Sequence, residues 1–168
     1  MNYIGIEPTS LVNGDGIRCV LWVAGCNHHC KGCHNPDTWD PHAGKRFYAG
    51  DYLTIRERVG KDYCDGLTLS GGDPMYPKNR SAILSLCKLF RIDFGHTKTI
   101  WMYTGYSFSE IRDDPILDYL DVIVDGEYIE SQRSPTRQWV GSENQRVWRK
   151  IDGLWFCEEP RYADKRMQ

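Results

Sequence analysis

The sequence lacks the features that define several classes of protein. Its 21 basic and 23 acidic residues give a formal net charge of −2, so it has no general basic field for nucleic acid. No apolar run approaches the roughly 18 residues that a membrane span needs. The first residues contain neither the basic region nor the apolar region of a secretory signal. We therefore expect a cytoplasmic protein without nucleic-acid or membrane partners.

An even, paired cysteine pattern is also missing. The chain has seven cysteines, an odd number, and we expect a reducing compartment, so a disulfide scaffold is a poor interpretation. Three of them form a C-x3-C-x2-C triplet: Cys26, Cys30 and Cys33. The other four are isolated, as small buried apolar residues often are. The sequence assigns no role to these four, which are Cys19, Cys64, Cys87 and Cys157.

What the sequence does contain is an alternation of strand-like and helix-like segments. The 168 residues predict one domain, 1–168, with a loop over 8–16 and a solvated tail over 158–168. Asp51 is the expected N-cap of the first helix. Such alternation is typical of parallel βαβ units. Strands are predicted at 18–24, 66–70, 98–103 and 121–124, with further strands at 145–150 and 154–157, and helices at 51–59, 79–90, 108–112 and 116–120.

Glycines mark the ends of the four central strands. They are Gly25, Gly71, Gly105 and Gly126, each at or just after the carboxyl end of a predicted strand. In parallel α/β sheets, ligands bind at this edge. We therefore expect the functional site there.

Two metal chemistries compete for the cysteine triplet. A structural zinc site needs four closed ligands, and His28, His29 or His34 could supply the fourth. A [4Fe-4S] cluster on three cysteines leaves one iron open to a substrate. The chain has no second, distant ligand pair of the usual zinc type, which favours iron and sulfur. We interpret the three histidines as exposed loop residues rather than ligands.

The triplet resembles the signature of the radical S-adenosylmethionine (AdoMet) superfamily. The resemblance implies that Cys26, Cys30 and Cys33 hold a [4Fe-4S] cluster whose fourth iron binds AdoMet. One electron then splits AdoMet into methionine and a 5′-deoxyadenosyl radical. Many members carry an aromatic residue before the third cysteine. Here Gly32 stands there, so the backbone of Gly32, Cys33 and His34 is expected to face the adenine and a stacking partner must come from elsewhere.

Further motifs resemble those with which this family binds AdoMet. The turn Gly71-Gly72-Asp73 follows the second predicted strand, as the family's glycine-glycine-acid motif does. By resemblance, it receives the methionine end, since two glycines permit close backbone approach and a carboxylate suits an ammonium. By the same resemblance, Thr104, Gly105 and Asp125 are further AdoMet contacts. For Arg18, a place near the cluster and a structural role fit equally well. Physical reasoning assigns no role to residues 141–146.

Segments 25–39, 67–74, 103–106, 121–126 and 139–146 together resemble the enzymes that activate anaerobic ribonucleotide reductases. The resemblance implies an oxidoreductase that generates a glycyl radical on the large subunit of an anaerobic ribonucleoside-triphosphate reductase. A flavodoxin-like protein would supply the electron, and the resemblance is compatible with a homodimer. The implied fold is α/β, a single-domain, incomplete (open) β/α barrel with a mostly parallel sheet, because about 250 residues are needed to close one.

Three alternatives stay open at this point. The chain could activate a different glycyl-radical enzyme, although it has no second cluster motif. It could act on a small molecule, as a deazaguanine synthase-like radical AdoMet enzyme does. It could instead be a zinc-binding adaptor without catalytic activity, which metal and sulfide analysis would distinguish.

Overall fold

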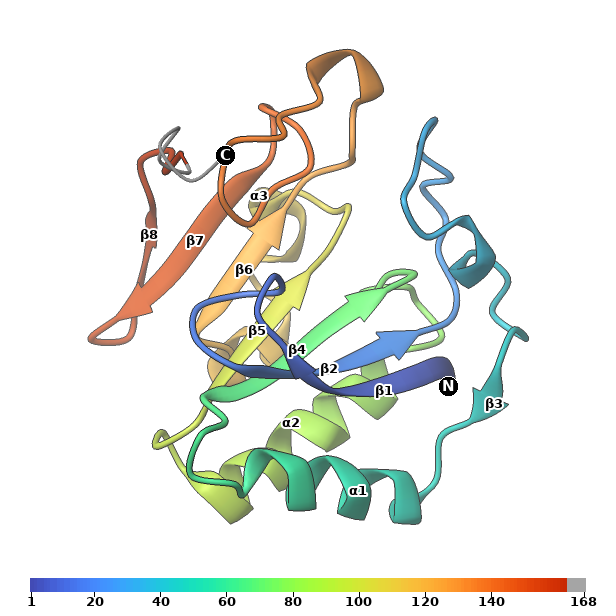
Figure 1. Ribbon diagram of the computed structural model, residues 1–168, viewed down its shortest axis with the longest axis vertical. Helices are drawn as coiled ribbons and strands as arrows, with labels where there is room; N and C mark the ends of the chain where they lie inside the picture. Colours follow the sequence, from blue (N-terminus) through green and yellow to red (C-terminus); the bar gives the residue numbers. More distant parts are fainter. Residues whose placement is uncertain (163–168) are drawn as a thin grey trace.

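A single curved sheet forms the framework of the protein. The structure is a computed structural model and describes residues 1–162 (Figure 1). Over this range eight strands pair in the order β3-β1-β2-β4-β5-β6-β7-β8. The strands are β1 (Asn2–Ser10), β2 (Arg18–Val23), β3 (Lys45–Arg46), β4 (Gly66–Gly71), β5 (Thr99–Tyr103), β6 (Val122–Asp125), β7 (Arg146–Ile151) and β8 (Leu154–Cys157).

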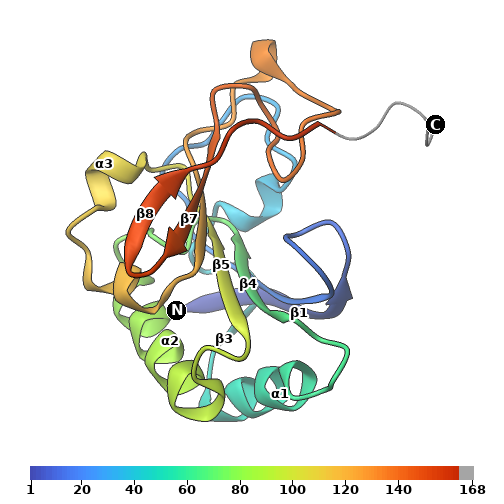
Figure 2. The ribbon, with the colours of Figure 1, turned by 90° about the vertical axis from the view of Figure 1, so that its left-hand side faces the viewer.

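Alternating side chains divide the sheet into two faces. On one face Leu21, Leu69 and Met102 pack with the helices α1 and α2 into the main core. Figures 1 and 2 show both helices on this side of the sheet. The opposite face carries a smaller core around Trp101 and Val124. The helices are α1 (Ala49–Val59), α2 (Arg80–Phe94) and α3 (Phe108–Ile111), with short 3-10 turns η1 (Pro36–Thr38), η2 (Pro115–Tyr119) and η3 (Glu130–Gln132).

The prediction of a mostly parallel sheet is wrong. Within residues 1–162 only three pairings are parallel, those of β2 with β4, β4 with β5, and β5 with β6. The four outer pairings are antiparallel. Short connections join β1 to β2 and β7 to β8, and antiparallel neighbours of this kind need no crossover helix. The protein is therefore a mixed α/β domain whose sheet is not closed.

Three local expectations also need correction. Residues 8–10, expected in a loop, end the strand β1. The helix α1 begins at Ala49 after Tyr48, and Asp51 lies at its third position, where its carboxylate accepts a hydrogen bond from the Tyr48 N–H (2.7 Å). The tail is anchored at its start, since Glu158 pairs with Arg149. Residues 163–168 of the expected tail lie outside the described residues.

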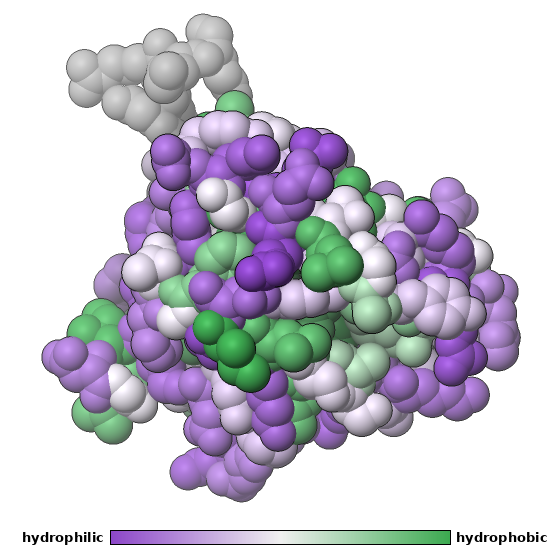
Figure 3. Space-filling model, turned by 90° about the horizontal axis from the view of Figure 1, so that it is seen from below, coloured by the Kyte–Doolittle hydropathy of each residue, from purple (hydrophilic) through white to green (hydrophobic). Residues whose placement is uncertain are grey.

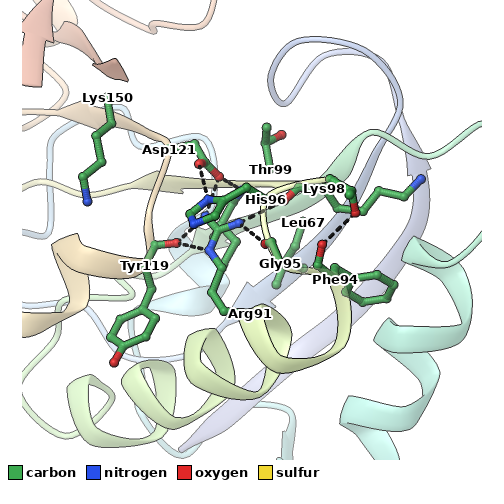
Figure 4. A network of polar contacts seen from close by, with 12 residues as sticks. Leu67, Arg91, Phe94, Gly95, His96, Lys98, Thr99, Tyr119, Asp121 and Lys150 are labelled. Atoms are coloured by element: carbon green, nitrogen blue, oxygen red, sulfur yellow. Dashed lines mark hydrogen bonds and ion pairs between the residues drawn. The ribbon is translucent and has the colours of Figure 1, made fainter. Parts of the chain in front are cut away.

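A polar network holds α2 against the amino ends of β5 and β6 (Figure 4). The Arg91 guanidinium donates to the carbonyl oxygens of Tyr119, Gly95 and Lys98 and to the Asp121 carboxylate at 2.6 Å. Asp121 also accepts a hydrogen bond from the Ile100 N–H (2.6 Å). The network lies at the edge of the sheet opposite to the carboxyl ends, so it supports the fold rather than the site.

The outer side of the helices is largely hydrophilic, with smaller apolar areas between the polar ones (Figure 3). Leu53 of α1 and Leu89 and Ile92 of α2 are exposed apolar side chains. Among residues 1–162, no helix is both long and apolar enough to cross a membrane.

Candidate functional site

A cavity of about 450 Å³ opens at the carboxyl ends of the parallel strands. This volume lies within the roughly 300–1,000 Å³ of typical small-molecule sites. Its walls come from segments far apart in the sequence, which Figure 1 shows rising from one edge of the sheet. They include the triplet cysteines, the glycine-rich turn after β4 and the end of β5: Cys26, Cys30, Cys33, Gly71, Gly72, Asp73, Thr104 and Gly105.

The glycines at this edge permit a close backbone approach. Gly72 N–H donates to Val23 O (2.8 Å) and Asp73 N–H to Gly25 O (2.8 Å), so the ends of β2 and β4 are joined directly. A Cβ atom at Gly72 would lie 2.5 Å from Gly25 O and 2.8 Å from Thr38 O. Only glycine fits here without moving backbone.

The three cysteines lie on one loop, residues 26–34, which we call the cysteine loop. The Cys33 sulfur accepts a hydrogen bond from the Asn35 N–H (3.4 Å), which fixes its position on the loop. Burial raises the pKa of Cys26 and of Cys30, and the backbone amides of His28 and Tyr128 partly oppose this rise. A metal centre favours the thiolate form, because metal binding releases the thiol proton.

The two metal chemistries place different demands on the donor groups. Within residues 1–162, no three thiol, imidazole or carboxylate groups converge closely enough to hold one metal ion. A [4Fe-4S] cluster is held by cysteine thiolates. The three cysteines of the loop line one cavity, so the donors that are present fit such a cluster.

The Asp73 carboxylate is buried and accepts hydrogen bonds from within the protein. The side chain is only 1% exposed. It accepts hydrogen bonds from the hydroxyl of Thr104 (2.9 Å) and from the backbone N–H groups of Met75 (2.8 Å) and Gly105 (3.0 Å). The resemblance implied that Asp73 is an acceptor for the AdoMet ammonium. In the structure its carboxylate ties β4 to β5, and Asp73 lines the cavity together with Gly71 and Gly72.

His28 is the cavity-lining residue that sequence reasoning missed. The expectation that it is an exposed loop residue is wrong, because its side chain is 11% exposed and lines the cavity. Its ring lies between the carboxylates of Asp73 (Nε2 to Oδ2, 3.0 Å) and Glu127 (Nδ1 to Oε1, 2.7 Å). These carboxylates raise the pKa of His28 to about 9. His29 and His34 are exposed, as expected.

Asp125 does not line the cavity. It lies on the helix-covered side of β6 and is fully buried. Its carboxylate accepts hydrogen bonds from the Arg146 guanidinium (2.6 and 3.1 Å) and from the Phe108 N–H (2.6 Å). Asp125 therefore joins β6 to β7 and to the start of α3.

Residues 127–145, here called the capping segment, close the cavity on the β6 side. Gln145 Oε1 accepts a hydrogen bond from the Gly141 N–H (2.8 Å), and Gln145 Nε2 donates to Gly126 O (2.9 Å). The buried Ser142 hydroxyl accepts from the Ile129 N–H (3.1 Å). These contacts explain the polar run 141–146, which the sequence left unplaced. Tyr128 of this segment lies against His34 of the cysteine loop, with ring centroids 5.2 Å apart.

Arg18 does not lie near the cysteine loop. It begins β2, so it lies at the edge of the sheet opposite to the cysteine loop. Its buried guanidinium donates to Leu67 O (2.7 Å), Thr99 O (3.0 Å) and the Thr68 hydroxyl (3.1 Å). Desolvation lowers the pKa of Arg18 to about 10. Of the two roles that the sequence allowed, the structure supports the structural one.

Comparison with known proteins identifies the family of this chain. The family model of a 4Fe-4S single cluster domain matches residues 12–148, which defines the class as a single-cluster iron–sulfur domain. Three curated relatives are each named anaerobic ribonucleoside-triphosphate reductase-activating protein. The one from Enterobacteria phage T4 is 44% identical over 156 residues, which is 92% of this chain and 98% of the relative. Those from Vibrio cholerae and Escherichia coli K12 are 41% and 37% identical, over 89% and 88% of this chain and 98% and 97% of the relatives. The chain belongs to the family of anaerobic ribonucleoside-triphosphate reductase-activating proteins.

Proposed function

We propose that this protein activates an anaerobic ribonucleoside-triphosphate reductase by radical AdoMet chemistry. The observation that carries the proposal is that the cysteine triplet, the glycine-rich turn after β4 and the end of β5 line the same cavity. The names of the relatives support the choice of reductase over another glycyl-radical enzyme or a small molecule. An open barrel of the radical AdoMet type is the architecture that we propose for the mixed sheet.

Each wall of the cavity has a part in the proposed reaction. Cys26, Cys30 and Cys33 would hold the [4Fe-4S] cluster, and the turn at Gly71 and Gly72 would receive the methionine end of AdoMet through its backbone. When bound, the cluster would supply the one electron for cleavage of AdoMet to methionine and a 5′-deoxyadenosyl radical, which would take a hydrogen atom from a glycine of the reductase. The protein's own residues orient the two cofactors and limit access of water to the cavity.

The remaining predicted contacts fall into two groups. Gly32, Cys33 and His34 belong to the cysteine loop, and Gly32 and His34 lie beside Glu130 and Tyr128 of the capping segment. We propose that they flank the adenine. Asp73 and Thr104 would act indirectly, by fixing the backbone around AdoMet, and Asp125 by anchoring the strand that leads into the capping segment.

The partners follow from the same proposal. The substrate is the large subunit of the reductase, whose glycine-bearing loop would reach the open side of the sheet. A flavodoxin-like protein is the proposed electron donor, the protein is proposed to act in the cytoplasm, and a homodimer is compatible with the reaction.

The test is an anaerobic reconstitution with iron and sulfide, followed by addition of a reductant, AdoMet and the reductase large subunit. We expect 5′-deoxyadenosine by chromatography and a glycyl radical by electron paramagnetic resonance (EPR). Cys30→Ala should abolish both products. Cys87→Ala is the matched control, since this buried cysteine lies in the main core and not in the cavity. A protein that binds zinc without iron or sulfide would contradict the proposal.

A further inference from the structure

The cysteine loop is attached to the rest of the site through one of its own side chains, His28. We infer that His28 is a positioning residue, which holds the cysteine loop in a fixed relation to the strand ends that line the AdoMet cavity. The inference rests on the proposed function and assigns a role to a residue that is neither a cysteine of the triplet nor part of the glycine motif.

The contacts of His28 reach three different strand ends. Its Nε2 lies 3.0 Å from Asp73 Oδ2 after β4, and its Nδ1 lies 2.7 Å from Glu127 Oε1 after β6. After β5, Gly105 packs so closely on the ring that a Cβ atom there would overlap it. The neighbouring Tyr106 meets the same ring edge-on, with centroids 4.7 Å apart. The His28 imidazole therefore contacts a residue that follows each of the strands β4, β5 and β6.

Asp73 connects His28 to other residues of the cavity wall. The carboxylate that faces His28 is the same one that accepts the Thr104 hydroxyl and the Gly105 N–H. Asp73 also directly follows Gly72 of the glycine-rich turn. The His28–Asp73 contact therefore links the residues that would hold the cluster with those that would hold AdoMet. Because Asp73 has its acceptors occupied within the protein, its effect on AdoMet is indirect.

The adjacent His29 provides a matched comparison. It belongs to the same C-x3-C segment but is exposed, and its ring lies near Trp39, with centroids 4.8 Å apart. Its backbone φ is +48°, a conformation that asparagine also adopts readily. His29→Asn therefore changes the same loop by a similar amount while leaving its conformation and the strand contacts intact.

Removal of the His28 ring should loosen the loop without removing any cluster ligand. We expect His28→Ala to retain wild-type iron and sulfide content and to bind AdoMet about tenfold more weakly, a change equivalent to about 1.4 kcal/mol. His28→Gln, which can still reach one carboxylate, should lose less. Because the effect passes through Asp73, the double variant His28→Ala/Asp73→Asn should bind AdoMet no more weakly than Asp73→Asn alone.

The experiment uses the full-length, anaerobically reconstituted protein and titrates AdoMet against the EPR spectrum of its reduced cluster. The spectral change is normalised to iron content, so a loss of cluster or of folded protein alone does not move the apparent dissociation constant. The expected order of affinity is wild type and His29→Asn, then His28→Gln, then His28→Ala. Equal dissociation constants for His28→Ala and His29→Asn would overturn the inference.

The controls separate this inference from the proposed function. If AdoMet leaves the wild-type cluster spectrum unchanged, the proposed function fails, and the positioning role fails with it. If the wild type responds and His28→Ala responds at the same AdoMet concentration, only the positioning role fails. Should His28→Ala not assemble a cluster, the comparison of His28→Gln with His29→Asn decides the question in the same way.

Discussion

Gly72 is the position where a single methyl group should disturb the site most directly. In Gly72→Ala the new Cβ would meet two carbonyl oxygens, Gly25 O at 2.5 Å and Thr38 O at 2.8 Å. Both oxygens accept backbone hydrogen bonds, from Asp73 N–H and Gly25 N–H, each at 2.8 Å. Neither is the end of a flexible side chain, so relief of the overlap requires movement of backbone.

The size of the effect follows from these contacts. Overpacking of this kind costs about 1–3 kcal/mol, and weakening one backbone hydrogen bond costs about 1 kcal/mol more. We expect the free energy of unfolding to fall by about 2–4 kcal/mol. For a chain of this size, 1 kcal/mol shifts the melting temperature by roughly 2–4 °C, so the expected decrease is roughly 4–16 °C. The ends of β2 and β4 should also separate, which weakens AdoMet binding.

The assay is thermal denaturation of the cluster-free protein under reducing conditions, followed by AdoMet cleavage on the reconstituted protein. Gly50→Ala is the control, because no atom lies within 4 Å of its added Cβ and alanine favours the helix α1. It should melt at or slightly above the wild-type temperature and cleave AdoMet normally. If Gly72→Ala behaves like Gly50→Ala in both measurements, the close approach of the two strand ends is not required for stability or function.

Two further predictions test the fold around the site. Arg18→Met should lower the free energy of unfolding by about 2–4 kcal/mol in urea denaturation, because two buried acceptors and one part-buried acceptor lose their donor. A loss of AdoMet affinity without a loss of stability would instead assign Arg18 to the site. At pH 8, iodoacetamide should modify Cys157 long before Cys87, as read by mass spectrometry. Cys157 is exposed, whereas burial raises the pKa of Cys87 to about 12 and leaves roughly one thiol in 10⁴ as thiolate. Comparable rates would mean that the helix-side core opens readily.

The four central strands were predictable from sequence because each is a short apolar run with a glycine at its end. The strand β1 was not, because Pro8 and its neighbours are typical of turns. In the structure β1 shifts register against β2 between Glu7 and Ser10. That irregularity accommodates Pro8, which has no N–H to donate. Local propensity was therefore overridden by pairing with a strand that the sequence identified correctly.

The site was predictable where its chemistry is local and not where it depends on distant contacts. The cysteine spacing and the glycine-rich strand ends are short motifs. The partners of His28 lie 45 and 99 residues further along the chain, so no local pattern identifies them. The position of Asp125 could have been found from strand alternation, because Val122 and Val124 belong to the opposite face of β6.

The order in which the cavity walls occur along the chain has a consequence for biosynthesis. The cavity begins with Glu7, receives its cysteines at 26–33 and obtains its last wall from Gly141 and Gln145. A ribosome-bound chain that ends before Gln145 displays the three thiols on an incomplete site. The polypeptide must therefore extend past this residue before all walls of the cavity are present.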